Sequence, residues 1–385
     1  MKMGRGCLVR GMMIAAVLIG SEACSKPKSS AGTAADKQKP IEVPLDRDAI
    51  AKTHVDLRSV PNEDPKLAYR MGVPASWTYS KAAAAAAKDG MPRSLGDFAV
   101  SDASGATSIS VTVTHFPFEI PIDAWVKLAL AHEGYQILRA TYFPGPHGLF
   151  FDATGVRGAG DRQEVTRTTA RVEGSDVFSV NTVSDRKDWD AVKDVFWLAH
   201  LSFNLVAGAG DTRMEPWKFA HADNPDFQTS RPASWSSEVV KQPSKDVSAV
   251  DIRLLNPAGN VVLGYVQVRA LRGDDGHPAL DVAALRDDSL AKLKKSLGYV
   301  PSRPFQPLTL DDDPRSEAAK GWLGGFSGEE KLGENDMAVR LGYLRRGDLT
   351  FSIIALSAPV RDDTMAALRT QRAFEIARDT LRLPD

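Results

Sequence analysis

Residues 109–114 and 337–343 alternate hydrophobic and polar side chains with the two-residue period of a half-buried strand. The second run continues through Gly347–Asp348 into Phe351 and Ile353, which is the pattern of a hairpin. Residues 261–271 are more uniformly apolar and predict a central strand. The chain therefore contains strands that are expected to pair in antiparallel fashion.

Four further segments carry the three- to four-residue period of amphipathic helices. Asp123 and Asp281 are predicted N-caps of two of them, and Gly134 and Gly298 are predicted stops. The predicted inward faces are Trp125, Leu128, Ala129 and His132; Val282, Leu285, Leu290, Leu293 and Leu297; Trp189, Val192, Phe196 and Ala199; and Ala373, Ala377 and Leu381.

The order of these elements occurs twice. Pro74-Ala75-Ser76-Trp77 recurs as Pro232-Ala233-Ser234-Trp235, and in each copy a strand-like run, a helix and a Gly-Tyr pair follow. The spacing from Trp to Gly is 57 residues in the first copy and 63 in the second. Repeats of this length indicate duplicated domains rather than solenoid units.

Each copy is predicted to run strands, helix, hairpin strands, helix, which gives an antiparallel sheet covered by helices. The fold class is therefore α+β, in two tandem copies at 62–207 and 214–385, with a linker at 208–213. With Pro74 and Trp77 in one copy and Pro232 and Trp235 in the other, each copy resembles the PsbP/DcrB-like domain. That resemblance implies binding or assembly modules, some of them periplasmic lipoproteins, and it implies no catalytic residues.

The N-terminus has the layout of a secretory signal peptide. Three basic residues precede the nine apolar or small residues Met12–Gly20, and Ser21-Glu22-Ala23-Cys24 follows. A membrane-spanning helix needs about 20 apolar residues, so this stretch is too short to be a permanent anchor. We expect cleavage before Cys24, leaving residues 1–23 as the signal.

Cys24 stands where a bacterial lipoprotein carries the acylated cysteine, although Ser21 and Glu22 depart from the usual lipobox. The alternative is an ordinary signal peptidase site and a free thiol on a secreted protein. Because Cys7 leaves with the signal, Cys24 is the one cysteine of the mature chain, and lipidation would remove an exposed thiol. Residues 24–61 are then a lipidated N-terminus and flexible tether, since 26–40 have almost no bulky apolar side chains.

Composition excludes some functions. The formal net charge is −1, and no basic stripe marks a nucleic-acid interface. Phosphate-binding and zinc-protease motifs are missing, and Gly325-Phe326-Ser327-Gly328-Glu329 lacks the last glycine of a nucleophile elbow. No two of the seven histidines have the i, i+3 or i, i+4 spacing of a helical metal site, and His132 and His200 are expected at helix surfaces or ends. We predict no catalytic residue, no metal, no cofactor and no cluster of metal-ligand geometry.

Phe116 and Phe118 lie between prolines in a loop of the first copy, whereas the equivalent stretch 272–278 of the second copy is polar. A need shared by both cores would appear in both copies, so these two rings are predicted to be exposed at a domain interface or a partner surface. Phe143, in another loop, is assigned the same role. Trp77 and Trp235 are expected to be core anchors.

The leading hypothesis is an exported, lipid-anchored lipoprotein that faces the periplasm or the cell surface. It would act as a non-catalytic binding or assembly module for an unknown envelope protein. Its N-terminal lipid would attach it to the membrane. The alternative is a lipoprotein that binds a small ligand or lipid in a groove between sheet and helix. A hydrolase with an unrecognised site is the third hypothesis.

The lipid anchor is testable in bacteria. Cys24→Ser should abolish the incorporation of radiolabelled palmitate and release the protein from the membrane fraction, because no other cysteine remains in the mature chain. Cys7→Ser is the matched control, since that residue leaves with the signal. A Cys24→Ser protein that still sediments with membranes would show that something other than lipid holds it there.

Overall fold

The computed structural model describes residues 55–81, 88–100, 107–145, 148–207, 213–241, 246–272, 282–297, 300–301, 304–308, 321–332 and 335–383. All of them belong to one compact unit, Leu45–Asp385. The predicted signal peptide, Cys24, the cap Asp281, the stop Gly298 and all of the linker except Arg213 lie outside the described residues. Among the described helices, none combines the length and apolar character needed to cross a membrane.

The first sheet domain contains a seven-stranded antiparallel sheet of order β3-β4-β5-β9-β8-β7-β6 and a small sheet of order β1-β2-β10. Its elements are β1 (Val55–Val60), η1 (Pro65–Leu67), β2 (Tyr69–Pro74), β3 (Thr78–Ser80), β4 (Pro92–Ala99), β5 (Ser108–His115), α2 (Ile122–His132), β6 (Gln136–Gly145), β7 (Gly148–Arg157), η2 (Gly160–Arg162), β8 (Glu164–Glu173), β9 (Asp176–Asp185), α3 (Trp189–Ser202) and β10 (Asn204–Leu205).

The second sheet domain repeats this plan. Its main sheet has the order β13-β14-β15-β20-β19-β18-β16, with β17 paired to β18, and β11 and β12 form a separate hairpin. Its elements are β11 (Trp217–Ala222), β12 (Phe227–Pro232), β13 (Ser236–Val240), β14 (Val247–Leu255), β15 (Val262–Arg272), α4 (Val282–Leu297), β16 (Val300–Pro301), β17 (Gln306–Pro307), β18 (Trp322–Leu332), β19 (Asn335–Arg346), β20 (Leu349–Ser357) and α5 (Thr364–Asp379).

The two main sheets match strand for strand, so the predicted α+β class with two tandem sheets is confirmed. Hairpins close through Gly174 and Gly347, both at positive φ, and place β8 beside β9 and β19 beside β20. The flexible tether was predicted to cover residues 24–61. That prediction is wrong for Val55–Val60, because these residues form β1 and pair with β2. The remaining domain boundaries stay predictions.

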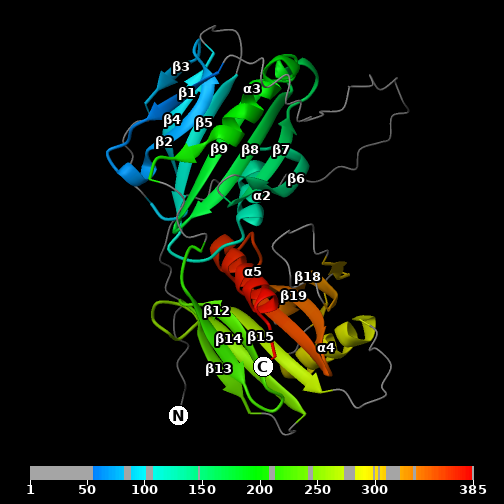
Figure 1. The fold of residues 1–385 in the computed structure, drawn as a ribbon. Helices are drawn as coiled ribbons and strands as arrows, with labels where there is room; N and C mark the ends of the chain where they lie inside the picture. The colour runs from blue at the N-terminus through cyan, green and yellow to red at the C-terminus, as the bar shows by residue number, and fades with distance from the viewer. Residues whose placement is uncertain are drawn as a thin grey trace, which may run out of the picture. The chain divides into compact units, whose positions relative to one another are not determined.

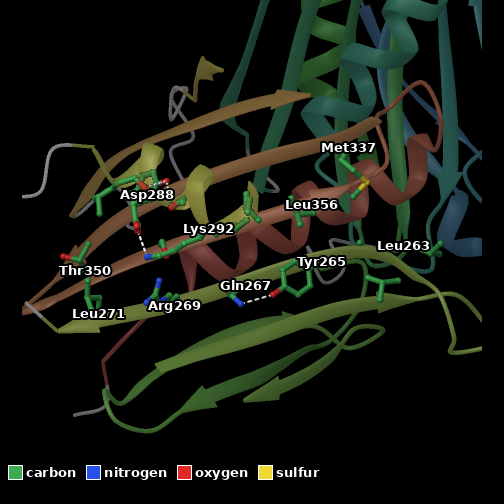
Figure 2. A pocket seen from close by; sticks show the side chains of 18 residues that line it. Leu263, Tyr265, Gln267, Arg269, Leu271, Asp288, Lys292, Met337, Thr350 and Leu356 are labelled. Atoms are coloured by element: carbon green, nitrogen blue, oxygen red, sulfur yellow. Dashed lines mark hydrogen bonds and ion pairs between the residues drawn. The ribbon is translucent and has the colours of Figure 1, made fainter. Parts of the chain in front are cut away.

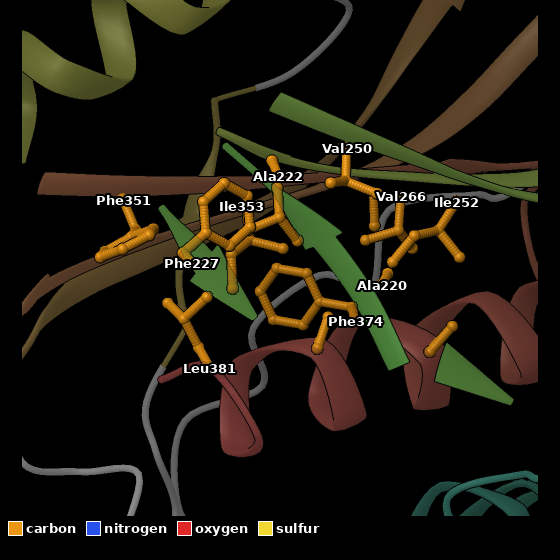
Figure 3. Close-up of a cluster of buried hydrophobic side chains, with 14 of the residues drawn as sticks. Ala220, Ala222, Phe227, Val250, Ile252, Val266, Phe351, Ile353, Phe374 and Leu381 are labelled. Atoms are coloured by element: carbon orange, nitrogen blue, oxygen red, sulfur yellow. The ribbon is translucent and has the colours of Figure 1, made fainter. Parts of the chain in front are cut away.

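Each main sheet has a long helix on either face (Figure 1). In the second domain, alternate residues of β15 and β20 point to α5 and form a core with the β11–β12 hairpin (Figure 3). Phe374 projects from α5 into this core, beside Val266 and Ile353. Trp77 and Trp235 are 7% and 2% exposed, which confirms their prediction as core anchors.

The helix ends and faces were predicted with mixed success. Gly134 ends α2 with φ +83°, as expected, but the N-cap is Pro121, and Asp123 lies in the first turn instead. The predicted inward face of α2 is confirmed only in part, since Trp125 and Leu128 pack against the core cluster but stay half-buried. Ile122, Val126 and Leu130, four residues apart, are fully buried, whereas His132 is exposed. The error follows from reading the stripe from Trp125, which packs only at the edge of the cluster.

His200 lies in the last turn of α3, as expected for a helix end, but its side chain is buried inside the first domain rather than at the helix surface. It is 1% exposed, and its Nδ1 and Nε2 lie 2.8 and 3.3 Å from the hydroxyls of Thr169 and Thr182. Because the Thr182 hydroxyl donates to the Arg167 carbonyl, it accepts from Nε2–H, and Nδ1 accepts from Thr169. Burial, and then the charge of Arg167, lower the pKa of His200 well below its usual value.

The loop before α2 meets residues of the second domain. Glu119 is 3% exposed, and its Oε1 accepts hydrogen bonds from the Met214 amide (3.1 Å) and Trp217 Nε1 (3.0 Å). Its Oε2 accepts from Arg372 Nε at 3.1 Å. A buried carboxylate is costly unless it is paired, and these three donors satisfy it.

The close approach of Trp235 and α5 to β15 depends on Gly264. A Cβ at this position would lie 2.9 Å from Trp235 Cη2 and closer still to Thr370 Oγ1. Gly264→Ala should therefore lower the free energy of unfolding by about 1–3 kcal/mol in urea denaturation. Adding Thr370→Ala should recover part of that loss, and Val239→Ala on the exposed β13 should change little. Fully additive losses would contradict the predicted clash.

His200 predicts a pH dependence of stability. Its pKa is lower in the folded than in the unfolded state, so the unfolded chain takes up the proton first as the pH falls. Between about pH 7.5 and about pH 5.5 the free energy of unfolding should fall, by up to about 1.4 kcal/mol per pH unit below about pH 6.5. His200→Gln should flatten that slope, and the exposed His132→Gln should leave it unchanged. Equal slopes in all three proteins would refute the assignment.

Candidate functional site

A groove of about 620 Å³ lies between α4 and the main sheet of the second domain. β15 and β20 form most of its floor, and α4 forms one wall (Figure 2). The lining residues are Val262, Leu263, Gly264, Tyr265, Gln267, Arg269 and Leu271 from β15; Leu285, Asp288, Ser289, Lys292 and Leu293 from α4; Met337 and Tyr343 from β19; and Thr350, Ser352, Ile354 and Leu356 from β20.

The groove exists because α4 is too narrow to cover its face of the sheet. Seven strands about 4.8 Å apart span about 29 Å, whereas a helix is about 10 Å wide. The contacts of α4 with the main sheet are with β18 and β19, where Leu293 packs on Val339 and Leu341 in a buried cluster. The adjoining strands β20 and β15 therefore present uncovered side chains beside the helix.

Tyr343 of β19 holds α4 against the main sheet. Its hydroxyl lies 3.2 Å from the Leu285 carbonyl and 3.0 Å from Ser289 Oγ, and the ring is 1% exposed. Burial raises the pKa of Tyr343 to about 12, so the hydroxyl keeps its proton at neutral pH and can donate to α4. The helix is thus bonded to the sheet at the inner edge of the groove.

The strand register gives the floor a polar end and an apolar end. Leu271 pairs with Thr350 and Arg269 with Ser352, whereas Tyr265 pairs with Leu356. Figure 2 shows Thr350, Leu271, Arg269 and the Asp288–Lys292 ion pair toward one end, and Leu263, Met337 and Leu356 toward the other. An elongated ligand would therefore meet hydroxyls, a guanidinium and an ion pair at one end, and aliphatic side chains at the other.

A satisfied polar cluster lies beside the middle of the floor. The Tyr265 hydroxyl donates to Asp251 Oδ1 at 2.7 Å, and Gln267 Nε2 lies 2.9 Å from the same oxygen. Arg253 donates to the other carboxylate oxygen at 2.9 Å. Burial, and then the hydrogen bond to Asp251, raise the pKa of Tyr265. These groups are paired with one another and do not require a ligand.

The floor of the groove belongs to the second domain alone. Phe178 pairs with Val113 in the first domain, as Phe351 pairs with Ala270 in the second, so the two registers correspond. On the same face the first domain then has Ser108, Ser110 and Thr112 where the second has Tyr265, Gln267 and Arg269. A requirement of the shared fold would appear in both copies, so the larger side chains of the second copy indicate a function of that copy.

Acid–base groups are few in the lining of the groove. The described residues that line it include neither histidine nor cysteine, and its one carboxylate, Asp288, forms an ion pair with Lys292. Nucleophilic catalysis would need a nucleophile and a base within hydrogen-bonding distance. The motif at 325–329, which lacks the last glycine of a nucleophile elbow, lies inside strand β18 rather than at a strand-to-helix turn.

Two of the three phenylalanines predicted for a partner surface are half-buried, and one is buried. Phe116 is 0% exposed and packs edge-on against Trp125, so its predicted exposure is wrong. Phe118 lies under the Arg369 guanidinium, 4.3 Å from ring centroid to Cζ. Phe143 stacks on Phe150 at 5.5 Å. Phe116 shares its cluster with Met214 and Leu368, which supports the domain-interface alternative over a free surface.

One cluster of metal-ligand geometry exists among the described residues, against the prediction of none. His221, Asp223 and Asp226 lie in and beside the turn between β11 and β12, with their ligand atoms within 4.8 Å of one another. His221 Nε2 lies 2.6 Å from Asp226 Oδ1, and all three side chains are exposed. The sequence criterion compared histidines at helical spacing. It could not predict this cluster, because a tight turn brings one histidine together with two aspartates.

The groove residues are not among the site residues predicted from the sequence. Residues 261–271 are more uniformly apolar than the alternating strands, although Gln267 and Arg269 interrupt the run on alternate positions. Their period of two, with Tyr265, was the available signal that one face of β15 differs from the buried face formed by Val266 and Val268.

No protein-family model matches the chain, and no curated protein matches it. Among solved structures, PsbP from the cyanobacterium Synechocystis is 13% identical with a TM-score of 0.29, over 39% of this chain and 92% of that chain. The apo immunity protein TplEi of the T6SS from Pseudomonas aeruginosa is 10% identical with a TM-score of 0.19, over 87% and 98%. The matching chain of the Tle4–Tli4 complex is 9% identical with a TM-score of 0.20, over 82% of this chain and 94% of that chain. A fold does not transfer a ligand, so the groove itself has to indicate what it binds.

Proposed function

We propose that this chain is a non-catalytic binding protein of the bacterial cell envelope, anchored by a lipid on Cys24, and that the groove beside α4 binds an elongated apolar ligand. The observation that carries the proposal is the half-covered face of the second sheet, where apolar side chains of β15 and β20 lie beside α4. The size is that of pockets that take small ligands, about 300–1,000 Å³.

The affinity of such a site would come from burial of apolar surface. Each methylene group moved from water into the groove contributes about 0.8 kcal/mol, so a chain of about 15 methylenes contributes about 12 kcal/mol. After a cost of association of about 4 kcal/mol, that leaves the roughly 8 kcal/mol of micromolar affinity. The floor needs no rearrangement to receive it, because Tyr343 and the Asp251 cluster already fix the helix and the neighbouring side chains.

A protein partner is the second candidate, and one observation favours it. The β1–β2 hairpin pairs Val55 with Pro74, and the β11–β12 hairpin pairs Trp217 with Pro232. Two residues after Val55 on β1, and two after Trp217 on β11, each copy exposes a large apolar side chain. Leu57 is 62% exposed and Phe219 is 65% exposed. Exposure retained in both copies fits a surface that a partner covers.

The groove can be blocked without removing core contacts. Ser352 is a small, half-buried residue of the floor, and Ser352→Trp should fill the space beside α4. Titration of the delipidated mature protein with the neutral fluorophore N-phenyl-1-naphthylamine should show saturable binding, weakened about tenfold or more by Ser352→Trp. Ser236→Trp, on the exposed edge strand β13, is the matched control.

Circular dichroism would show that both variants are folded. Absence of saturable binding to the wild-type protein, or equal loss in Ser236→Trp, would refute a ligand site in the groove. Binding that Leu57→Asp and Phe219→Asp weaken, but Ser352→Trp does not, would favour the outer hairpins and the protein partner.

A further inference from the structure

Arg269 is an unusual residue for the floor of an apolar groove. Its side chain is half-buried on β15, between Leu271 and Gln267 on the same face. Among the described residues it has no hydrogen bond and no ion pair, whereas the neighbouring cations Lys292 and Arg253 each contact a carboxylate. A guanidinium that is partly removed from water without a partner costs free energy, and an anion would offset that cost.

Two hydroxyls lie beside this guanidinium. Ser352 is the direct cross-strand neighbour of Arg269, and Thr350 stands two residues along β20 on the same face. Both are half-buried lining residues, and their hydroxyls form no hydrogen bond to any described group. Directly opposite residues of antiparallel strands have Cβ atoms about 5 Å apart, so an oxyanion can contact the guanidinium and the Ser352 hydroxyl together.

The other end of the groove is aliphatic. Leu263, Met337 and Leu356 line it, and none of them carries a polar group. Arg269 and Leu263 are six residues apart on one strand, which corresponds to about 20 Å. The charged end and the aliphatic end are thus separated by the length of a long alkyl chain, along a floor that continues from one to the other (Figure 2).

We propose that the groove binds a single-chain anionic amphiphile, with its carboxylate or phosphate at Arg269, Ser352 and Thr350 and its alkyl chain directed toward Leu263 and Met337. This inference rests on the proposed ligand-binding function and adds the class of ligand. A fatty acid and a lysophosphatidate share the chemistry of the head group and the chain, and they differ in the anion that Arg269 would meet.

The test compares ligands of equal chain length in displacement of N-phenyl-1-naphthylamine from the delipidated mature protein. Palmitate and hexadecanol differ only in the head group, and palmitoyl lysophosphatidate tests phosphate. Palmitate or lysophosphatidate should bind at least about tenfold more tightly than hexadecanol, because a charge-assisted hydrogen bond in a partly desolvated site contributes that much.

Arg269→Gln should remove the preference for the anion, so that palmitate, lysophosphatidate and hexadecanol bind this variant with similar affinities. Arg269→Lys, which keeps the positive charge, should keep part of the preference and remains informative if the glutamine variant fails to fold. Lys294→Gln, on the exposed side of α4, is the charge-matched control and should behave as wild type.

The outcomes separate this inference from the function beneath it. If hexadecanol binds as tightly as both anions, the anionic head group is refuted while ligand binding in the groove stands. If Arg269→Gln keeps the wild-type preference, the anion lies elsewhere and the assignment to Arg269 is overturned. If none of the three compounds displaces the fluorophore and the fluorophore itself does not bind, the proposed function fails as well.

Discussion

The width of a helix relative to that of a sheet governs the architecture of this chain. A path of seven strands is about 29 Å across, and one helix of about 10 Å covers little more than two of them. On one face of each sheet, a second hairpin covers strands that the helix leaves uncovered. In the second domain this is the β11–β12 hairpin, which packs with α5. On the other face of the second sheet, α4 lies over β18 and β19, and the groove is the uncovered remainder.

Duplication makes this remainder informative. Both copies keep the strand order, the buried tryptophan and the glycine turns, because these determine whether the sheet forms. In the first copy, the sheet face beside α2 carries the small hydroxyl side chains Ser108, Ser110 and Thr112. Water can satisfy the hydrogen bonds of these hydroxyls. In the second copy Tyr265, Gln267 and Arg269 replace them. Divergence at positions that the fold leaves free is the usual place for a binding function.

Buried charges separate structural from functional roles within the described residues. Glu119 receives three donors, and Arg167 makes two hydrogen bonds to Asp152 at 2.7 and 2.9 Å while lying over the Trp197 ring. Both groups are paired with an opposite charge, although Arg167 Nη1 has no hydrogen-bond partner among the described residues, and both hold neighbouring elements together. Arg269 is the contrasting case, since no described residue forms an ion pair with it and the one carboxylate that lines the groove, Asp288, is paired with Lys292.

The sequence determined what depends on local periodicity. Alternation at 109–114 and 337–343, the turn at Gly347 and the repeat around Trp77 and Trp235 predicted the strands, the hairpins and the duplicated α+β fold. Only the tertiary structure decided which residues of α2 are fully buried, that His200 and Phe116 are internal, and that Arg269 lies beside Ser352 some 83 positions later in the chain. Burial and cross-strand pairing join residues distant in sequence, and a local pattern carries no record of the partner that tertiary packing supplies.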